Sequence, residues 1–255
     1  MVIFRHMFHL LVSIPSFLFG GCLSEAMTAE RLYDAGDDSA AVRSLEQAQV
    51  GQPGCAETAW RLAYVRLAEA NREPDMLLRT KLWKLGRNLS ERCAATFPRS
   101  GGAWFAMALE AGVESTFAGA RRRVELSKIV HDRVARSIDL DPNLAGSWYL
   151  LAKWHEGLCS LNIVERGFAN LLLGGLPEGA SLDSTREYLK RSNSLRPNSP
   201  LVLFELARNL ERSGRLSEAL AICHYASSLP RLAVGDRINL DKIDRLRQKL
   251  EAKAS

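Results

Sequence analysis

Histidine is scarce in this sequence, and its five copies are scattered along the chain. None stands beside a serine or cysteine in a recognisable nucleophile motif. His155 lies in the run Lys153–Glu156, where a packed histidine is far commoner than a catalytic one. Phosphate-binding loops are missing too, since Gly174-Gly175 is an isolated pair. The sequence therefore predicts no catalytic residue, no cofactor and no enzymatic function.

Charge of one sign is also low, because 34 Lys and Arg residues stand against 29 Asp and Glu residues, a formal net charge of +5. This charge is mild and spread out, so it does not indicate a nucleic-acid partner. The run Arg121–Arg123 is typical of a solvated helix start. The five cysteines show no zinc-ligand spacing, and no alternating strand pattern of convincing length appears. These absences argue against metal-binding, nucleic-acid-binding and β-sheet classes.

What the sequence does contain is a helical repeat with a period of about 34 residues. Its clearest copy runs from Pro200 to Pro230, with an apolar stripe on a first helix and small residues on a second. Antiparallel helices approach closely only where one side lacks bulk, and the closing proline stops the second helix. The positions are Leu203, Leu206, Ala207 and Leu210, then Gly214, Ala219, Cys223 and Ala226. This is the tetratricopeptide pattern.

Four more copies follow this template, at about residues 22–53, 56–98, 101–142 and 145–197. The last of these four carries an apolar insertion at 158–182. After the copy at 200–230, a charged stretch over 236–253 is predicted to be a helix that caps the open end of the stack. Its apolar face consists of Ile238, Ile243, Leu246 and Leu250. We therefore predict one all-α domain over 22–255, a tetratricopeptide-like α-solenoid of about five helix-turn-helix units.

Residues 1–21 have the organisation of a secretory signal peptide, with an early Arg5, an apolar stretch, and Gly20-Gly21 before Cys22. The stretch is too short and too interrupted to be a comfortable membrane span. Phe19–Cys22 resembles a bacterial lipobox, although leucine lies one residue further back than usual, at Leu18. We predict lipidation of Cys22 and an exported protein, either periplasmic or a membrane-anchored lipoprotein. The alternatives are cleavage to a soluble secreted form and retention as an uncleaved N-terminal anchor.

Four cysteines remain if Cys22 carries lipid: Cys55, Cys93, Cys159 and Cys223. Cys223 occupies a core helix position and Cys93 lies near a helix crossing, so both are predicted to be buried thiols. Export permits disulfides, and Cys55 and Cys93 belong to one repeat unit. Spacing alone leaves open whether these two residues are paired.

The inner, concave face of the predicted solenoid carries the candidate binding residues. In this register the fifth position of successive first helices points into the groove, and one turn further on lies a second inward position. An exposed apolar surface of this kind needs a cover or a ligand. Either the apolar insertion folds back over it, or an apolar or amphipathic ligand lies beneath the insertion. The fifth positions are Trp60, Phe105, Tyr149 and Phe204, and the second set is Tyr64, Leu109, Lys153 and Arg208.

Several runs around the insertion, and the tail, resemble the regulator of microtubule dynamics family. They are Ile138–Asn143, Leu150–Glu156, Arg166, Leu176-Pro177 before Ser181, and a tail from Ala219 through Leu229-Pro230 to Leu246. The likeness covers roughly residues 55–250 and implies a tetratricopeptide-like helical domain. It also implies links to microtubules or to mitochondrial and endoplasmic-reticulum membranes in eukaryotic members, and phospholipid in one tethering member. The N-terminus departs from that family because it resembles a bacterial export signal, so we do not extend microtubule binding to this chain.

Two functions follow from these observations. The first is a non-enzymatic adaptor that binds a protein partner at the bacterial cell envelope, held at the membrane through Cys22. The alternative is a carrier whose concave groove holds a lipid or another apolar ligand. No motif identifies the partner, because repeat scaffolds encode affinity in surface detail and fold alone does not imply function.

Overall fold

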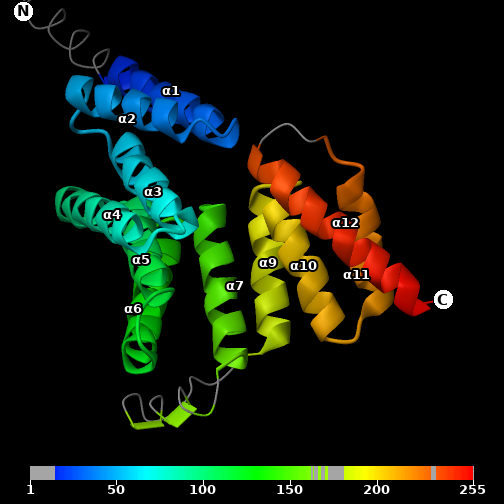
Figure 1. Ribbon diagram of the computed structural model, residues 1–255. Coiled ribbons are helices and arrows are strands. Elements are labelled where there is room, and N and C mark those ends of the chain that lie inside the picture. Colours follow the sequence, from blue (N-terminus) through cyan, green and yellow to red (C-terminus); the bar gives the residue numbers. More distant parts are fainter. Residues whose placement is uncertain are drawn as a thin grey trace, which may run out of the picture.

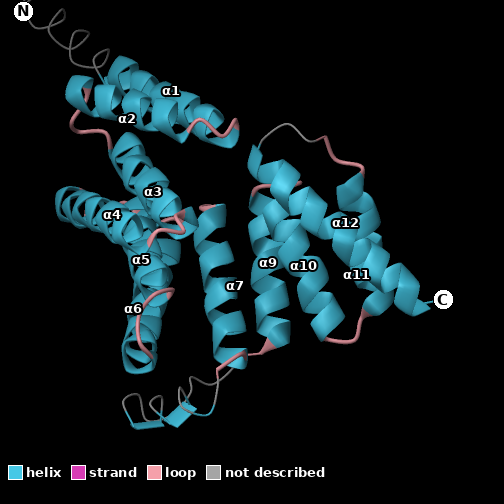
Figure 2. Cartoon of the chain, in the orientation of Figure 1, coloured by secondary structure: helices cyan, strands magenta, loops and turns pink. Residues whose placement is uncertain are grey.

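The computed structural model describes residues 15–161, 181–230 and 234–254, together with 163, 166–167 and 170–171; the side chains of 15–20, 234–235 and 254 are excepted. All regular structure in these ranges is helical (Figures 1 and 2). The all-α prediction is therefore confirmed. The helices are α1 (Pro15–Asp34), α2 (Asp38–Gly51), α3 (Ala56–Arg72), α4 (Met76–Thr96), α5 (Gly101–Ser115), α6 (Ala120–Leu140), α7 (Ala145–Cys159), α9 (Leu182–Leu195), α10 (Pro200–Arg212), α11 (Leu216–Ser227) and α12 (Val234–Ala254).

Consecutive helices form pairs that stack along the chain (Figure 1). The pairs are α1–α2, α3–α4, α5–α6, α7–α9 and α10–α11, and α12 packs against both helices of the last pair. Within each pair we call the earlier helix the first helix. The molecule is the tetratricopeptide-like α-solenoid that the repeat pattern predicted.

The helices begin and end where the sequence supplies caps and turn residues. Asp37 and Asp75 accept hydrogen bonds from the amides of Ala40 (2.8 Å) and Leu78 (2.7 Å), which satisfies free N–H groups at the starts of α2 and α4. The turn of the last pair contains Gly214, whose φ of 74° is in the left-handed region that glycine adopts without steric cost. Local chemistry and the repeat pattern thus agree.

Two glycines let large rings lie flat against the next unit. Gly102, the second residue of α5, lies against the ring of Trp60, which a methyl group at that position would overlap. Gly146, the second residue of α7, stands in the same relation to Phe105, with an added Cβ only 2.8 Å from the ring. Trp60 and Phe105 are consequently only 7% and 6% exposed. The aromatic residues of α3 and α5 are therefore packing groups between units.

The C-terminal helix closes the apolar end of the stack, as expected for a cap. Its inward face contains Leu240, Ile243, Leu246 and Leu250, which pack against α10 and α11. The prediction of Ile238 on this face is wrong, because Ile238 is 51% exposed. Leu240 takes its place because the buried positions recur at 240, 243, 246 and 250, a spacing that turns Ile238 away from α10 and α11.

Cys22 and Cys55 form a disulfide that joins α1 to the start of α3, with their Cα atoms 5.9 Å apart. The alternative pairing of Cys55 with Cys93 is therefore wrong. Cys93 and Cys223 are free and buried, as predicted, and burial raises their thiol pKa values to about 12 and about 11. A sulfur in a disulfide cannot also carry a thioether-linked lipid, so the structure shows a second use for Cys22 that competes with the predicted lipidation.

The predicted boundary of the signal peptide falls inside α1, which runs from Pro15 to Asp34. Residues 1–14 lie outside the described part of the chain. In the part that is described, no helix combines the length and apolar character needed to cross a membrane.

Candidate functional site

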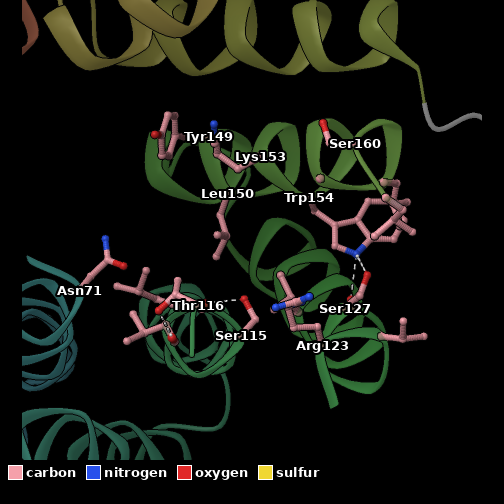
Figure 3. A pocket seen from close by; sticks show the side chains of 18 residues that line it. Asn71, Ser115, Thr116, Arg123, Ser127, Tyr149, Leu150, Lys153, Trp154 and Ser160 are labelled. Carbon is pink, nitrogen blue, oxygen red and sulfur yellow. Dashed lines mark hydrogen bonds between the residues drawn. The ribbon is translucent and has the colours of Figure 1, made fainter. Parts of the chain in front are cut away.

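Two cavities in the described part of the chain are lined by predicted groove residues, and the larger of these two has a volume of about 570 Å³. It opens between α5, α6 and α7, with Asn71 from the end of α3 at one side (Figure 3). Leu109 and Val113 from α5, with Leu150 from α7, form part of its apolar wall. We call this the large cavity.

Most polar side chains around the large cavity are already hydrogen-bonded within the protein. The indole nitrogen of Trp154 donates to the carbonyl oxygen of Ser127 (2.8 Å) and to its hydroxyl (2.9 Å), as Figure 3 shows. Ser115 and Thr116 donate to carbonyl oxygens of their own helix turn, at 2.6 and 2.8 Å. Because these groups are satisfied, the wall offers a ligand mainly apolar contact.

The second cavity, of about 380 Å³, lies under α1 and next to the end of α9. We call it the aromatic cavity, because Tyr33, Tyr64, Trp60 and Phe105 contribute to its lining. Tyr33 meets Tyr64 edge-on with ring centroids 5.3 Å apart, and Tyr64 stacks on Phe105 at 6.0 Å. Burial raises the pKa of Tyr64 well above its ordinary value, so this hydroxyl stays neutral.

The acidic residues at the rim of the aromatic cavity come from the last turns of α1. Arg61 pairs with Glu30 at 3.4 Å and with Glu57, and its guanidinium lies 4.1 Å from the centroid of the Trp60 ring. Arg196 reaches Glu30 and Asp34 from the end of α9. Burial raises the pKa of Asp34, and the charge of Arg196 opposes that rise.

The eight predicted groove residues fall into three surroundings. Trp60, Tyr64 and Phe105 line the aromatic cavity, and Leu109, Tyr149 and Lys153 line the large cavity. Phe204 instead lies beside α12, with the cationic groups of Arg208 and Lys242 each 5.6 Å from its ring centroid. The expectation of one exposed aromatic floor needs correction, because Trp60 and Phe105 are buried against the next unit and α12 lies beside Phe204.

Between α7 and α10 the inner face is charged. Lys153 pairs with Glu156 and, at 3.1 Å, with Glu205, which also accepts from Arg208 at 3.1 Å. Arg212 reaches Glu156 at 2.9 Å. Burial would raise the pKa of Glu156, but the hydrogen bond from Lys153 and the positive charges of Lys153, Arg208 and Arg212 hold it below its usual value. We call these five residues the charge cluster.

The predicted plug over the groove falls mostly on residues outside the described part of the chain. Leu161 does line the large cavity. Leu158, which is 4% exposed, lines it as well, whereas Ile163 and Leu171 are 87% and 78% exposed. These two side chains therefore do not fill the cavity.

His155 is packed between Trp154 and Tyr188, with ring centroids 4.9 and 5.0 Å away. Burial lowers its pKa, with a smaller contribution from His131, so the ring is neutral at pH 7. This is the packed histidine that the sequence predicted. Arg121 at the start of α6 is exposed, as expected for a solvated helix start.

Sequence reasoning missed the residues that join distant parts of the inner face. Tyr33, Glu30 and Asp34 lie on α1, outside the positions that the repeat template marks as inward, and Arg196 lies at the end of α9. No local pattern connects α1 to α9. Trp154 was noticed only as a neighbour of His155, although its ring forms part of the large cavity.

The fold and its lined inner face place this chain among the tetratricopeptide-like α-solenoids. A thermophilic TPR protein from Thermus thermophilus has a similar structure, with a TM-score of 0.59 at 18% identity over 88% of this chain and 99% of that one. A MamA fragment from Desulfovibrio magneticus RS-1 aligns over 91% of this chain and 96% of its own, at 11% identity, with a TM-score of only 0.37. No curated protein matches the chain.

The family is defined by the sequence. The model of regulator of microtubule dynamics protein 1-3 matches residues 26–251, and the chain belongs to this family. The match begins within α1 and extends into α12, so it covers the last part of α1 and all helices from α2 to α11.

Proposed function

We propose that this chain is a non-enzymatic adaptor that binds a protein partner on the inner face of its helical-repeat domain, at the bacterial cell envelope. The observation that carries the proposal is the large cavity, which is lined by residues of α5, α6 and α7, from two successive helix pairs, with Asn71 of α3 beside them. Helical-repeat proteins use such concave surfaces to hold partners. The charge cluster beside it adds groups that can select a partner by charge.

Site-specific photo-crosslinking in the full-length chain tests the adaptor function. A photoreactive amino acid replaces Leu109 or Lys153 on the inner face, and Lys128 or Lys190 on the exposed surface of α6 or α9 as matched controls. We expect one discrete protein adduct from the inner-face positions and none from the controls. Equal adducts at all four positions, or none at any, would contradict the proposal.

The envelope location rests on the export-like N-terminus and on Cys22. Metabolic labelling with an acyl-chain probe, in wild type and in Cys22→Ala, tests lipidation directly. Label in wild type alone supports the lipoprotein; equal label in both variants refutes it. Peptide mapping without reductant, in the same samples, measures the fraction of Cys22 that is joined to Cys55.

The alternative function is a carrier for a lipid or another apolar ligand, and the wall of the large cavity favours it. A volume of about 570 Å³ bounded by apolar side chains is of the size that small-molecule sites have. Organic extraction of the purified chain followed by mass spectrometry would detect such a ligand. An empty, protease-resistant protein would contradict the carrier function.

A cavity-filling variant makes this test specific. Gly157 lines the large cavity, and an added Cβ there meets no atom within 4 Å, so Gly157→Phe can be accommodated. Gly51 in α2 has equally open surroundings but lines neither cavity, which makes Gly51→Phe the matched control. We expect Gly157→Phe to lose bound apolar ligand and Gly51→Phe to retain it. Retention in both variants would place the ligand elsewhere.

A further inference from the structure

Arg196 joins two helix pairs that are far apart along the solenoid. Its Nη1 lies 3.1 Å from Glu30 Oε1 and its Nη2 lies 3.0 Å from Asp34 Oδ2. The contact with Asp34 spans a sequence separation of 162 residues and skips the second and third helix pairs. Figure 1 shows the end of α1 facing the end of α9 across the inner face. Repeat units normally contact only their neighbours, so this connection is unusual for the fold.

The ion pairs of Arg196 contribute little to the stability of the fold. Arg196, Glu30 and Asp34 have side chains that are 56%, 36% and 43% exposed. Ion pairs this exposed contribute at most about 1 kcal/mol, because water solvates the separated charges well. Among the described residues, every ion pair between α1 and α9 passes through this one guanidinium. The guanidinium can therefore be displaced without unfolding either helix.

Beneath Arg196 lies the aromatic cavity, whose chemistry suits a cation on an apolar stem. The two carboxylates stand at its rim, and the rings of Tyr33, Tyr64 and Phe105 form its wall. Ring faces attract cations electrostatically, and they also pack against the methylene groups of a long basic side chain. Arg61 also lines the cavity and lies 3.4 Å from Glu30 Oε2, but Glu57 and the Trp60 ring hold its guanidinium, and Glu30 Oε1 and Asp34 remain for a second cation.

We propose that the aromatic cavity is a binding site for an arginine side chain of a protein partner, which replaces Arg196 between Glu30 and Asp34. Arginine is favoured over lysine because one planar fork presents two nitrogens to two separate carboxylates, as Arg196 itself does. In the free protein Arg196 occupies the rim of the site and competes with the ligand. This proposal rests on the adaptor function and names the chemistry of its partner.

The competition can be measured with a small probe on the full-length chain. N-acetyl-arginine amide is titrated against wild type, Arg196→Gln, and the triple variant Arg196→Gln/Glu30→Gln/Asp34→Asn, with the Trp60 indole resonance as the readout. We expect Arg196→Gln to bind the probe about five-fold more tightly than wild type, because a competitor worth about 1 kcal/mol has been removed. The triple variant is expected to lose binding.

Two controls test the charge and the location. N-acetyl-citrulline amide has nearly the same shape as the arginine probe but no charge, so it is expected not to bind. Glu46→Gln removes an exposed carboxylate on α2 that pairs with Arg66, and it is expected to leave probe binding unchanged. Equal binding by Arg196→Gln and the triple variant, equal binding of the citrulline probe, or no saturable shift in Arg196→Gln would each overturn the proposal.

The outcome separates this site from the adaptor function. If inner-face crosslinking captures a partner and Glu30→Gln/Asp34→Asn still forms that adduct, the arginine site is wrong while the adaptor function stands. If the arginine probe binds as expected but a free guanidino compound is recovered with the protein and no adduct forms, the site stands and the adaptor function is wrong. Loss of the adduct in the acid-pair variant, with the protein still folded, supports both.

Discussion

The two halves of the inner face are held together by different chemistry. In the N-terminal half, rings from α3 and α5 are buried against glycines of the following unit, and a disulfide fixes α1 to α3. In the C-terminal half, the charge cluster connects α7 to α10, and Phe204 lies between cationic groups. The comparison teaches that the aromatic residue at the fifth position of a first helix is buried where the next first helix has glycine as its second residue, as Gly102 and Gly146 show. At α10, where Leu201 occupies the second position, the apolar contact of Val202 and Leu206 with Ala152 and Leu189 is supplemented by the ion pairs of the charge cluster.

Phe105→Ala and Phe204→Ala should give the largest difference between the halves. Phe105 is buried against Trp60, Tyr64 and Gly146, so we expect its removal to lower the free energy of unfolding by about 3–5 kcal/mol. Phe204 is only partly buried, and its removal should cost about 1–2 kcal/mol. Urea denaturation of both variants measures the two losses. Equal losses would mean that the halves are packed alike.

The disulfide should matter next. A cross-link across 33 residues restricts the unfolded chain, so Cys22→Ser/Cys55→Ser is expected to lose about 3–4 kcal/mol of unfolding free energy. The matched control is Cys159→Ser, which changes a free, partly exposed thiol. Reductant should destabilise wild type and leave the double variant unchanged. A wild type whose stability is insensitive to reductant would contradict a stabilising role for the disulfide.

Two glycine-to-alanine changes on one helix test the role of ring packing. Gly102→Ala would overlap the Trp60 ring, and we expect a loss of about 1–3 kcal/mol from overpacking. Gly112→Ala places its Cβ 3.9 Å from Leu150, an ordinary contact, and should gain about 0.5–1 kcal/mol from better helix propensity. Thermal denaturation distinguishes the signs. If both variants are stabilised, the Trp60 ring has room to move and the packing argument fails.

The smallest effects should appear in the pH dependence of stability, with opposite signs in the two halves. The pKa of Glu156 is lowered in the folded state, so its contribution is present above its ordinary pKa and is lost as the pH falls through the lowered value. The pKa of Asp34 is raised, so the folded state takes up this proton first and gains stability as the pH falls.

Glu156→Gln should therefore make the decline of stability in acid shallower, and Asp34→Asn should make it steeper. Unfolding free energies between neutral and acidic pH, measured by urea denaturation, check both slopes. Slopes that change in the same direction would show that the pKa values of the two carboxylates are not shifted in opposite directions.

The sequence was sufficient to predict the architecture because each repeat places bulky residues on its first helix and small residues on its second. Leu203, Ala207, Leu210 and Ala219 are buried where the template placed them. The site was only half predictable. Trp60 and Phe105 do contribute to the lining of a cavity, but their burial depends on Gly102 and Gly146 in the next unit, a relation that appears only when the helices are stacked.

Long-range chemistry was beyond sequence reasoning for a different reason. The pairing of Cys22 with Cys55 depends on where α1 crosses α3, and cysteine spacing carries no information about that crossing. Arg196 gives no local signal of its contact with Asp34, because nothing in the intervening residues encodes how far the solenoid curls. Such contacts are determined by the sum of many small rotations between units.

The contact through Arg196 also constrains how this protein can change its length in evolution. An open solenoid can gain or lose a unit in its middle, since each unit needs only its two neighbours. Here the ends of α1 and α9 meet only if the number of units between them is fixed. Additional sequence is then tolerated inside a unit and not between units. The extra residues between α7 and α9 are inside a unit, because these two helices form one pair. Because the ion pairs themselves add at most about 1 kcal/mol, a change in repeat number would remove the rim of the aromatic cavity and leave the fold intact.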